Sequence, residues 1–271
     1  MYKIIASDLD GTLFNSETKI SEENIEAIKK LTKMGVYFVP SSGRTLSEVP
    51  GSVKNNPDIR YIIHSNGATV HDKVTGENIL MCISKEEAKE LLDILYSYET
   101  HITLRQGGRC FIDPNFQKEE DYKYYNVWKL HEEVITEYGE RIKNFREFIY
   151  SLDNVEVVSA FFHDSDELEE CREKLLKTGF LRVAEGWKNN LEICSVKAGK
   201  GKALLHLADK LNINHKDTIA VGDSDNDTTM IKAAGLGLAV SNACDILKEN
   251  ADEIICSNEK HAISYILSHF F

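Results

Sequence analysis

The chain has 271 residues, of which 42% are hydrophobic and 28% are charged, values typical of a globular protein with room for one large domain or two ordinary ones. Its formal net charge of −12 argues against binding to a nucleic-acid backbone or an anionic membrane surface. An anionic substrate would need a local positive charge or a metal ion.

The six cysteines are scattered along the chain and form no CxxC pair. This usage is typical of reduced thiols in the cytosol. The first predicted strand begins within the first few residues, which leaves no room for a signal peptide, and no apolar run approaches the length of a membrane helix. We therefore expect a cytoplasmic protein.

The first predicted element is a short buried strand, Ile4-Ile5-Ala6, which leads into Asp8-Leu9-Asp10-Gly11-Thr12. Ligands of open α/β sheets collect at the carboxyl ends of strands, and two aspartates spaced two residues apart in extended backbone lean the same way. Because carboxylates held so close repel each other, we expect a metal ion or a shared proton between them.

A capped helix is expected from Ser21 to Gly35, with acidic residues in its first turn and an apolar stripe of Ile25, Ile28 and Leu31. Buried strands are then expected over residues 36–39 and 61–63. The order of strand, helix, strand, helix and strand predicts a parallel sheet.

Polar turns follow both of these strands. Ser41-Ser42-Gly43-Arg44 comes after the second strand, and Asn66-Gly67 comes after the third. A hairpin is expected over residues 69–81, about Thr75-Gly76.

The pattern changes near Ser84 to alternating helices and strands of an α+β arrangement. Ser84 and Glu87 match a capping box that opens a helix. Further elements are expected as strands near residues 102 and 111, a helical stretch over 138–150, a strand over 155–162, a helix over 167–177 and a strand over 180–184. The run 121–131 shows no clear pattern and is expected to lie on the surface.

The parallel pattern returns after Ile193, with a helix over 202–211, strands over 218–221 and 237–240, and a last strand and helix to the end of the chain. The predicted fold class is α/β. We expect a Rossmann-like core of three α/β/α layers with a parallel sheet, formed by residues 1–83 and 193–271. An α+β cap, residues 84–192, is expected to be inserted in it.

Four polar clusters mark this predicted core: Asp8 with Asp10, Ser42 with Gly43, Lys200 at a helix start, and Asp223 with Asp227. Each cluster alone has an ordinary explanation, because aspartate is common at helix caps, Ser-Gly is a common turn, and Lys197, Lys200 and Lys202 form a basic run of the kind that is usually solvated.

The spacing of Asp223, Asp225 and Asp227 also resembles the start of an EF-hand calcium loop. That loop requires glycine at its sixth position and glutamate at its twelfth, where this chain has Thr228 and Ala234. An EF-hand is therefore excluded.

Taken in order, the four clusters resemble the four motifs of the haloacid dehalogenase-like hydrolase superfamily, across the whole chain. The motifs are Asp8-Leu9-Asp10-Gly11-Thr12, Ser42-Gly43-Arg44, Lys200-Gly201 with Ala203-Leu204, and Gly222-Asp223-Ser224-Asp225-Asn226-Asp227. The inserted block, preceded by Asn66-Gly67-Ala68, resembles the Cof-like branch with its large α+β cap. The second motif more often has threonine where this chain has Ser42, and either hydroxyl serves.

The resemblance implies hydrolysis of a phosphate ester through an aspartyl-phosphate. Asp8 would be the nucleophile, and Asp10 would protonate the leaving oxygen and then activate water. A magnesium ion would be bound directly by Asp8 and Asp223, by the backbone carbonyl of Asp10, and by Asp227 through water or a neighbouring ligand.

Charge supports the metal independently. One like-charge pair at about 4 Å costs on the order of 4 kcal/mol at an effective dielectric constant of 20. Several aspartates would therefore repel a phosphate dianion, and the positive charge of a single lysine cannot offset this repulsion. Ligation by oxygen atoms together with a phosphate favours Mg²⁺ over Zn²⁺.

Further roles follow from the same resemblance. Lys200 would bridge Asp8 and the phosphate, while the Ser42 hydroxyl and the Gly43 amide would hold its oxygens. Leu9 and Asn226 are also predicted to bind the phosphate or orient its neighbours. Other polar residues at strand ends or in the cap are more simply explained as structural or stay undecided: Arg44, Asn66, His163, Trp187, Asn189, Asn190 and Asn242.

We therefore predict a cytoplasmic, Mg²⁺-dependent phosphatase of a small phosphorylated metabolite. Sugar phosphates are the first expected class, followed by phosphorylated cofactors such as pyridoxal or flavin phosphates. One alternative is a phosphotransferase or mutase that uses the same nucleophile. Another is a non-catalytic regulator that binds a phosphorylated metabolite, against which the presence of both Asp8 and Asp10 argues.

Overall fold

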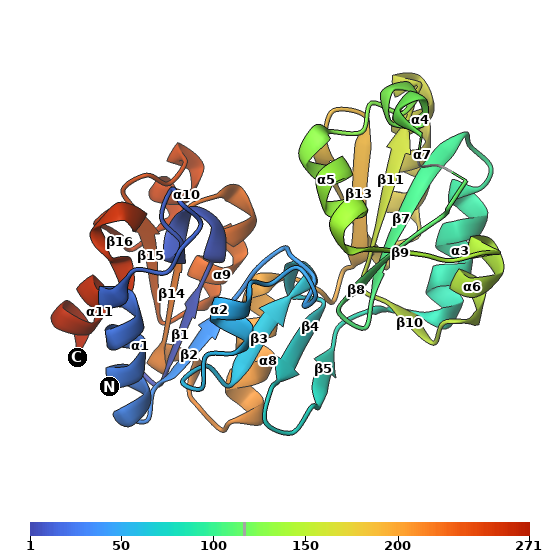
Figure 1. The fold of residues 1–271 in the computed structure, drawn as a ribbon. Coiled ribbons are helices and arrows are strands. Elements are labelled where there is room, and N and C mark those ends of the chain that lie inside the picture. Colours follow the sequence, from blue (N-terminus) through green and yellow to red (C-terminus); the bar gives the residue numbers. More distant parts are fainter. Residues whose placement is uncertain (116–117) are drawn as a thin grey trace. The chain divides into compact units, whose positions relative to one another are not determined.

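The computed structural model describes residues 1–115 and 118–271, without the side chains of residues 130, 186 and 187. The chain divides into two compact units (Figure 1). Unit 1 comprises Met1–Arg44, Val49–Leu80 and Gly199–Phe271, whereas unit 2 comprises Thr45–Glu48 and Met81–Ala198. No helix within the described ranges is long and apolar enough to cross a membrane.

The larger sheet of unit 1 has five parallel strands in the order β16-β15-β14-β1-β2. They are β1 (Ile4–Ser7), β2 (Tyr37–Pro40), β14 (Thr218–Gly222), β15 (Leu236–Val240) and β16 (Glu253–Ile255). β1 lies between two partners, since its Ala6 pairs with Val39 on one side and Ala220 on the other. The loops after β1, β2 and β14 therefore emerge at the same edge of the sheet.

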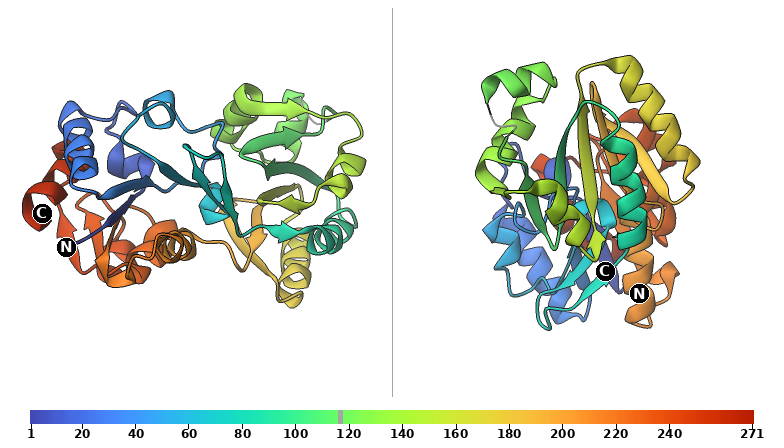
Figure 2. Two further views of the ribbon diagram at one scale, coloured as in Figure 1. Left: turned by 90° about the horizontal axis from the view of Figure 1, so that it is seen from below. Right: turned by 90° about the vertical axis from the view of Figure 1, so that its right-hand side faces the viewer.

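Helices lie on both faces of this sheet (Figure 2). α1 (Glu22–Lys33) packs beside α11 (Ala262–Phe270), and α8 (Lys200–Lys210) packs beside α9 (Thr228–Ala233). A shorter helix, α10 (Asp245–Asn250), follows β15. The predicted three-layer α/β/α core with a parallel sheet is confirmed.

The buried face of α1 differs by one position from the expected stripe. Ile28 and Leu31 are buried as predicted, but Ile25 is 39% exposed and Asn24 takes its place inside. The Asn24 side-chain oxygen accepts hydrogen bonds from the amides of Ile263 and Ser264 at the start of α11. A polar residue is therefore buried here because it accepts hydrogen bonds from two backbone amides in the first turn of α11, which have no partner within that helix.

The third predicted strand, β3 (Tyr61–His64), is not a member of the five-stranded sheet. It pairs antiparallel with β4 (Thr69–Asp72), which pairs with β5 (Asn78–Leu80) to complete the predicted hairpin. One parallel bridge, between Ser41 and Ile63, connects β3 to the end of β2. The prediction of a continuous parallel sheet is wrong at this strand, because β3 pairs along its length with β4 and meets β2 only through this one bridge within the described residues.

Between β2 and β3 of unit 1, where every residue is described, the only helix is the short α2 (Gly51–Lys54).

Unit 2 is an α+β structure built on a six-stranded sheet in the order β12-β13-β11-β7-β8-β9. Its strands are β7 (Thr100–Gln106), β8 (Arg109–Ile112), β9 (Gly139–Arg141), β11 (Val157–Phe162), β12 (Leu181–Trp187) and β13 (Asn190–Ser195). β6 (Ile83–Ser84) and β10 (Asn154–Val155) form a separate pair.

The helices of unit 2 are α3 (Lys85–Leu95), α4 (Glu119–Tyr124), α5 (Lys129–Tyr138), α6 (Phe145–Ser151) and α7 (Ser165–Lys177). Apolar side chains of α3, α6 and α7 form one buried cluster with those of the sheet, which includes Leu91, Leu104, Phe145, Phe162 and Cys171. This cluster is a core of its own, separate from the parallel sheet of unit 1.

Two expectations for unit 2 are wrong. The stretch 138–150 is not one helix, because α5 ends at Tyr138, β9 follows, and Asn144 has a positive φ of 56° directly before α6. The run 121–131 is not wholly superficial, since Tyr122 and Tyr125 are 7% and 5% exposed. Their rings are buried because both pack against His101 of β7.

Candidate active site

Asp8 follows β1 and opens a tight turn. Its amide donates to the carbonyl of Val221 in β14 over 3.0 Å, and the amides of Leu13 and Phe14 donate back to the carbonyls of Asp8 and Leu9. The side chain of Leu9 is fully buried. The turn therefore fixes Asp8 beside β14 and leaves only the backbone of Leu9 to meet a phosphate group.

Gly11 allows this turn to lie against Asp223. Its φ is +77°, and a Cβ atom added to it would lie 2.5 Å from the Asp223 Oδ2 atom. Its carbonyl accepts a hydrogen bond of 2.8 Å from the Asn242 side chain. Thr12 donates from its hydroxyl to Asp223 Oδ1 over 3.2 Å. Asn242 and Asp223 thus hold the turn after β1 in place.

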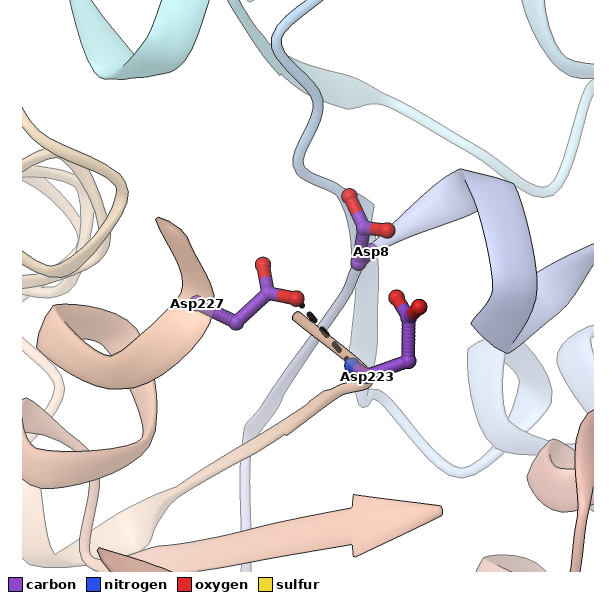
Figure 3. A group of neighbouring side chains, drawn as sticks. All are labelled: Asp8, Asp223 and Asp227. Atoms are coloured by element: carbon purple, nitrogen blue, oxygen red, sulfur yellow. Dashed lines mark hydrogen bonds between the residues drawn. The ribbon is translucent and has the colours of Figure 1, made fainter. Parts of the chain in front are cut away.

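Asp8, Asp223 and Asp227 converge at this edge of the sheet (Figure 3). One carboxylate oxygen from each of them lies within 4.8 Å of those of the other two. Asp8 is 6% exposed and Asp227 is fully buried. Carboxylate oxygens gathered in this way are the ligands that Mg²⁺ prefers in proteins.

Lys200, the first residue of α8, lies inside this cluster with its side chain 1% exposed. Its Nζ atom is 2.6 Å from Oδ1 of Asp8 and 2.6 Å from Oδ1 of Asp227. The structure separates it from the two neighbouring lysines, because Lys197 and Lys202 are exposed. Among the three lysines of the basic run, Lys200 is the one in contact with Asp8.

Both oxygens of Asp227 are engaged by donors of the protein itself. Oδ1 accepts from Lys200, and Oδ2 accepts from the amides of Asp223 at 3.1 Å and Ser224 at 3.2 Å. Asp227 therefore orients Lys200 and the loop after β14. Asp223 has its Oδ1 bound by Thr12 and contributes an oxygen to the acidic group with Asp8.

These groups, of which Asp223 is the partly exposed one, carry unbalanced charge, since three carboxylates meet one ammonium group and leave two negative charges when all are ionised. Burial raises the pKa of Asp8 to about 8, with Lys200 opposing and Asp227 adding to the rise. Burial and Asp227 also raise the pKa of Asp223. Burial alone would lower the pKa of Lys200, but Asp8 and Asp227 raise it. A divalent cation would balance this charge, so the donor set fits the predicted metal.

Ser42 and Gly43 lie in the loop after β2. The buried Ser42 donates its amide to the carbonyl of Ile63, and its hydroxyl oxygen accepts from the amide of Arg44 at 3.1 Å, which leaves the O–H as a donor. A Cβ atom on Gly43 would lie 2.9 Å from Asn66 Oδ1, so a larger residue here would displace the Asn66 side chain.

Asp10 is bound by Arg44. The Nε and Nη2 atoms of Arg44 each lie 2.8 Å from one oxygen of the Asp10 carboxylate. The first and second motifs therefore meet through this pair. Sequence reasoning left Arg44 and Asn242 without a role and missed Thr12; their positions just after strand ends were the available signal.

Asn226 is exposed, and its side-chain oxygen accepts a hydrogen bond from the Ser224 hydroxyl. In unit 2, the His163 ring contacts the Tyr124 carbonyl, and Asn189 and Asn190 donate to the carbonyls of His163 and Ala160, respectively. These three side chains thus make local structural contacts. The side chain of Trp187 lies outside the described residues.

Comparison with known proteins agrees with this geometry. The sequence pattern of the haloacid dehalogenase-like hydrolases matches residues 5–267. The chain belongs to this family. Similar proteins include the phosphatase YwpJ of Bacillus subtilis, 31% identical over 98% of this chain and 99% of the relative. Another is the 5-amino-6-(5-phospho-D-ribitylamino)uracil phosphatase YwtE of the same organism, 30% identical over 98% and 96% of the two chains.

Solved structures share the fold of this haloacid dehalogenase-like hydrolase. A Thermotoga maritima protein has a TM-score of 0.82 at 27% identity, covering 100% of this chain and 98% of its own. A haloacid dehalogenase-like hydrolase of B. subtilis has a TM-score of 0.78 at 29% identity, covering 99% and 100%. The protein is an enzyme of the Cof-like branch, a phosphatase that hydrolyses phosphoric monoesters.

Proposed function

We propose that the enzyme hydrolyses a small phosphorylated metabolite, a sugar or polyol phosphate, with Mg²⁺ as cofactor and through an aspartyl-phosphate on Asp8. The observation that carries this proposal is the contact of Lys200 with both Asp8 and Asp227, beside Asp223. Segments far apart in the sequence bring one ammonium group and two further carboxylates to the buried carboxylate of Asp8. The ammonium group supports a nucleophile that attacks an anion, and a divalent cation would balance the remaining negative charge.

In the first step, a carboxylate oxygen of Asp8 bonds to phosphorus, the bond from phosphorus to the leaving oxygen breaks, and Asp10 gives that oxygen a proton. Lys200 stabilises the negative charge beside Asp8. The Ser42 hydroxyl, the Gly43 amide and the backbone of Leu9 are suited to hold the phosphoryl oxygens. In the second step, water attacks the phosphorus of the aspartyl-phosphate while Asp10 takes its proton. The bond from phosphorus to the Asp8 oxygen breaks, which releases inorganic phosphate and restores the Asp8 carboxylate.

The proposed Mg²⁺ ligands are side-chain oxygens of Asp8 and Asp223 and the backbone carbonyl of Asp10. Asp227 holds Lys200 and the amide of Asp223 in position, and Asn226 orients the groups next to it. When bound, Mg²⁺ supplies positive charge that lets a phosphate dianion approach the carboxylates. The two excess negative charges of the cluster support this assignment.

The proposed substrate class rests on the substrate for which three relatives are named. YwtE, YcsE and YitU of B. subtilis, which are 30%, 31% and 27% identical to this chain, are named 5-amino-6-(5-phospho-D-ribitylamino)uracil phosphatases. That substrate carries its phosphate on a ribityl chain, which is a polyol. We assign the choice of leaving group to the inserted residues 84–192, and we place the enzyme in the cytoplasm on the basis of its cysteine usage.

A substrate screen tests this proposal. The purified enzyme is incubated with sugar, polyol, pyridoxal and flavin phosphates, and released inorganic phosphate is measured with Mg²⁺ or with EDTA. We expect release that needs Mg²⁺, is greatest with a sugar or polyol phosphate, and is lost in Asp8→Asn. Turnover that persists in Asp8→Asn contradicts the nucleophile, and turnover that persists in EDTA contradicts the metal.

A further inference from the structure

We propose that Arg44 is a positioning residue, which holds the Asp10 carboxylate in the orientation needed for proton transfer. The inference rests on the proposed function, since it concerns the step that Asp10 performs. The Asp10 side chain is 51% exposed, although its backbone lies within the tight turn after β1. An aspartate this exposed has freedom to rotate unless another group holds it.

The contact between the two side chains fixes the plane of the carboxylate. Nε of Arg44 donates to Oδ2 of Asp10 and Nη2 donates to Oδ1, both over 2.8 Å. Two parallel hydrogen bonds from a rigid guanidinium restrict rotation of the carboxylate, which a single contact from lysine would not. The geometry of the pair therefore sets the direction in which Asp10 faces.

Arg44 is itself anchored in the loop that we propose holds the phosphate. Its amide donates to the Ser42 hydroxyl oxygen over 3.1 Å, and its carbonyl accepts from the amide of Ser65 over 2.8 Å. The orientation of Asp10 is thereby tied to the position of Ser42. The group that supplies the proton and the group that holds the phosphoryl oxygens are set by one loop.

Stability does not explain this pair. The side chains of Arg44 and Asp10 are 32% and 51% exposed, and exposed ion pairs contribute little to folding. Arg60 and Asp72 of the same unit form a pair of the same chemistry, but the Asp72 side chain is only 4% exposed and also accepts from the amide of Val74. Arg60 thus has a structural role in the β3–β4 sheet and provides a matched control.

The first experiment uses two substrates of similar shape, phenyl phosphate and 4-nitrophenyl phosphate, with the full-length enzyme and Mg²⁺. Phenol is the poorer leaving group, so its release depends more on a proton from Asp10. We expect Arg44→Met to lower the ratio of kcat for phenyl phosphate to kcat for 4-nitrophenyl phosphate by about tenfold. Arg60→Met should keep the wild-type ratio. An unchanged ratio in Arg44→Met would overturn the inference.

Arg44→Lys provides a second variant, which keeps the charge and loses the two-point contact. We expect a ratio between those of wild type and Arg44→Met, and thermal unfolding of each variant shows whether it is folded. If Arg44→Met does not fold, the ratio in Arg44→Lys decides the question. A wild-type ratio in Arg44→Lys would then count against positioning by the guanidinium.

A double variant separates action through Asp10 from direct action on the substrate. In an Asp10→Asn background, Arg44→Met should change the rate of phenol release by no more than about twofold, because there is no acid left to position. If the rate losses caused by Asp10→Asn and Arg44→Met multiply in the double variant, Arg44 acts independently of Asp10, and the inference is overturned. Failure of the proposed function looks different, because Asp8→Asn would then retain turnover whatever the Arg44 variants do.

Discussion

Lys200 and Asp227 form a buried ion pair, with 2.6 Å between Nζ and Oδ1 and side-chain exposures of 1% and 0%. A pair this buried is costly to break, because the remaining charge stays uncompensated away from water. The same ammonium group contacts the proposed nucleophile, Asp8. One side chain therefore serves both the fold and the chemistry of the site.

Lys200→Met is expected to abolish turnover and to lower the free energy of unfolding by about 3–5 kcal/mol in EDTA, because three carboxylates lose their positive partner. Urea unfolding and phosphate release measure the two effects. Mg²⁺ should restore part of the stability but none of the turnover. Lys202→Met, on the exposed side of the same helix, should change stability by less than about 0.5 kcal/mol. Normal turnover in Lys200→Met would refute its role.

Mg²⁺ should raise the melting temperature of the wild-type enzyme, because the ion binds the folded site and not the unfolded chain. Asp223→Asn should lose this shift, since it removes one carboxylate of the acidic group. Asp225→Asn is a matched control in the same loop, where the side chain is exposed, and should keep the shift. Thermal unfolding with and without Mg²⁺ makes the comparison. An equal shift in both variants would place the ion elsewhere.

Gly11→Ala should impair both Mg²⁺ binding and turnover, because the added methyl group would meet Asp223 Oδ2 at 2.5 Å in a backbone with φ of +77°. A loss of about 1–3 kcal/mol in stability is expected from the strain. Gly76→Ala has nearly the same φ, +74°, with nothing within 4 Å of the added atom. That control should show backbone strain alone, with normal kinetics. Equal kinetics in the two variants would contradict the close approach of Gly11 to Asp223.

The stability of unit 2 should fall in mild acid. Burial lowers the pKa of His101 to about 4, and burial together with Arg105 and His101 lowers the pKa of His131 to about 3. Both values lie below about 6.5 for an unfolded histidine, so the unfolded chain binds more protons and stability is lost as the pH falls from 6.5 towards 4. At pH 5, each of the two histidines lowers the free energy of unfolding of unit 2 by on the order of 2 kcal/mol.

Both tryptophans of the chain belong to unit 2, so their fluorescence during urea unfolding at pH 7.5 and pH 5 reports this effect. His101→Phe should reduce the difference between the two pH values, because phenylalanine does not take up a proton. His206→Gln, at an exposed position of unit 1, should leave the difference unchanged. A difference as large in His101→Phe as in wild type would show that His101 does not cause the loss.

Local signals predicted most of the core. Ser21 accepts a hydrogen bond from the amide of Asn24, and Ser84 forms the expected capping box with Glu87, because both motifs depend only on residues within one helical turn. The apolar runs that end at Asp8 and Asp223 became neighbouring parallel strands. Their convergence followed because the carboxyl ends of parallel strands share one edge of a sheet.

Features that depend on distant partners were not predictable. β3 pairs along its length with β4 and shares one bridge with β2, although its sequence suits a parallel strand equally well. Asn24 is buried because donors from α11 reach it, which periodicity within α1 does not reveal. The pairing of Arg44 with Asp10 likewise joins two loops, and motif spacing gives no information about which side chains meet across them.

The short segment Thr45–Glu48 belongs to unit 2, although it follows directly on Arg44. The Ser47 amide donates to the carbonyl of Gly108 in the turn between β7 and β8. A chimera that grafts the insertion of another family member between residues 80 and 199 would therefore leave Ser47 without its native acceptor. To transfer substrate specificity between such enzymes, the segment Thr45–Glu48 has to be exchanged together with Met81–Ala198.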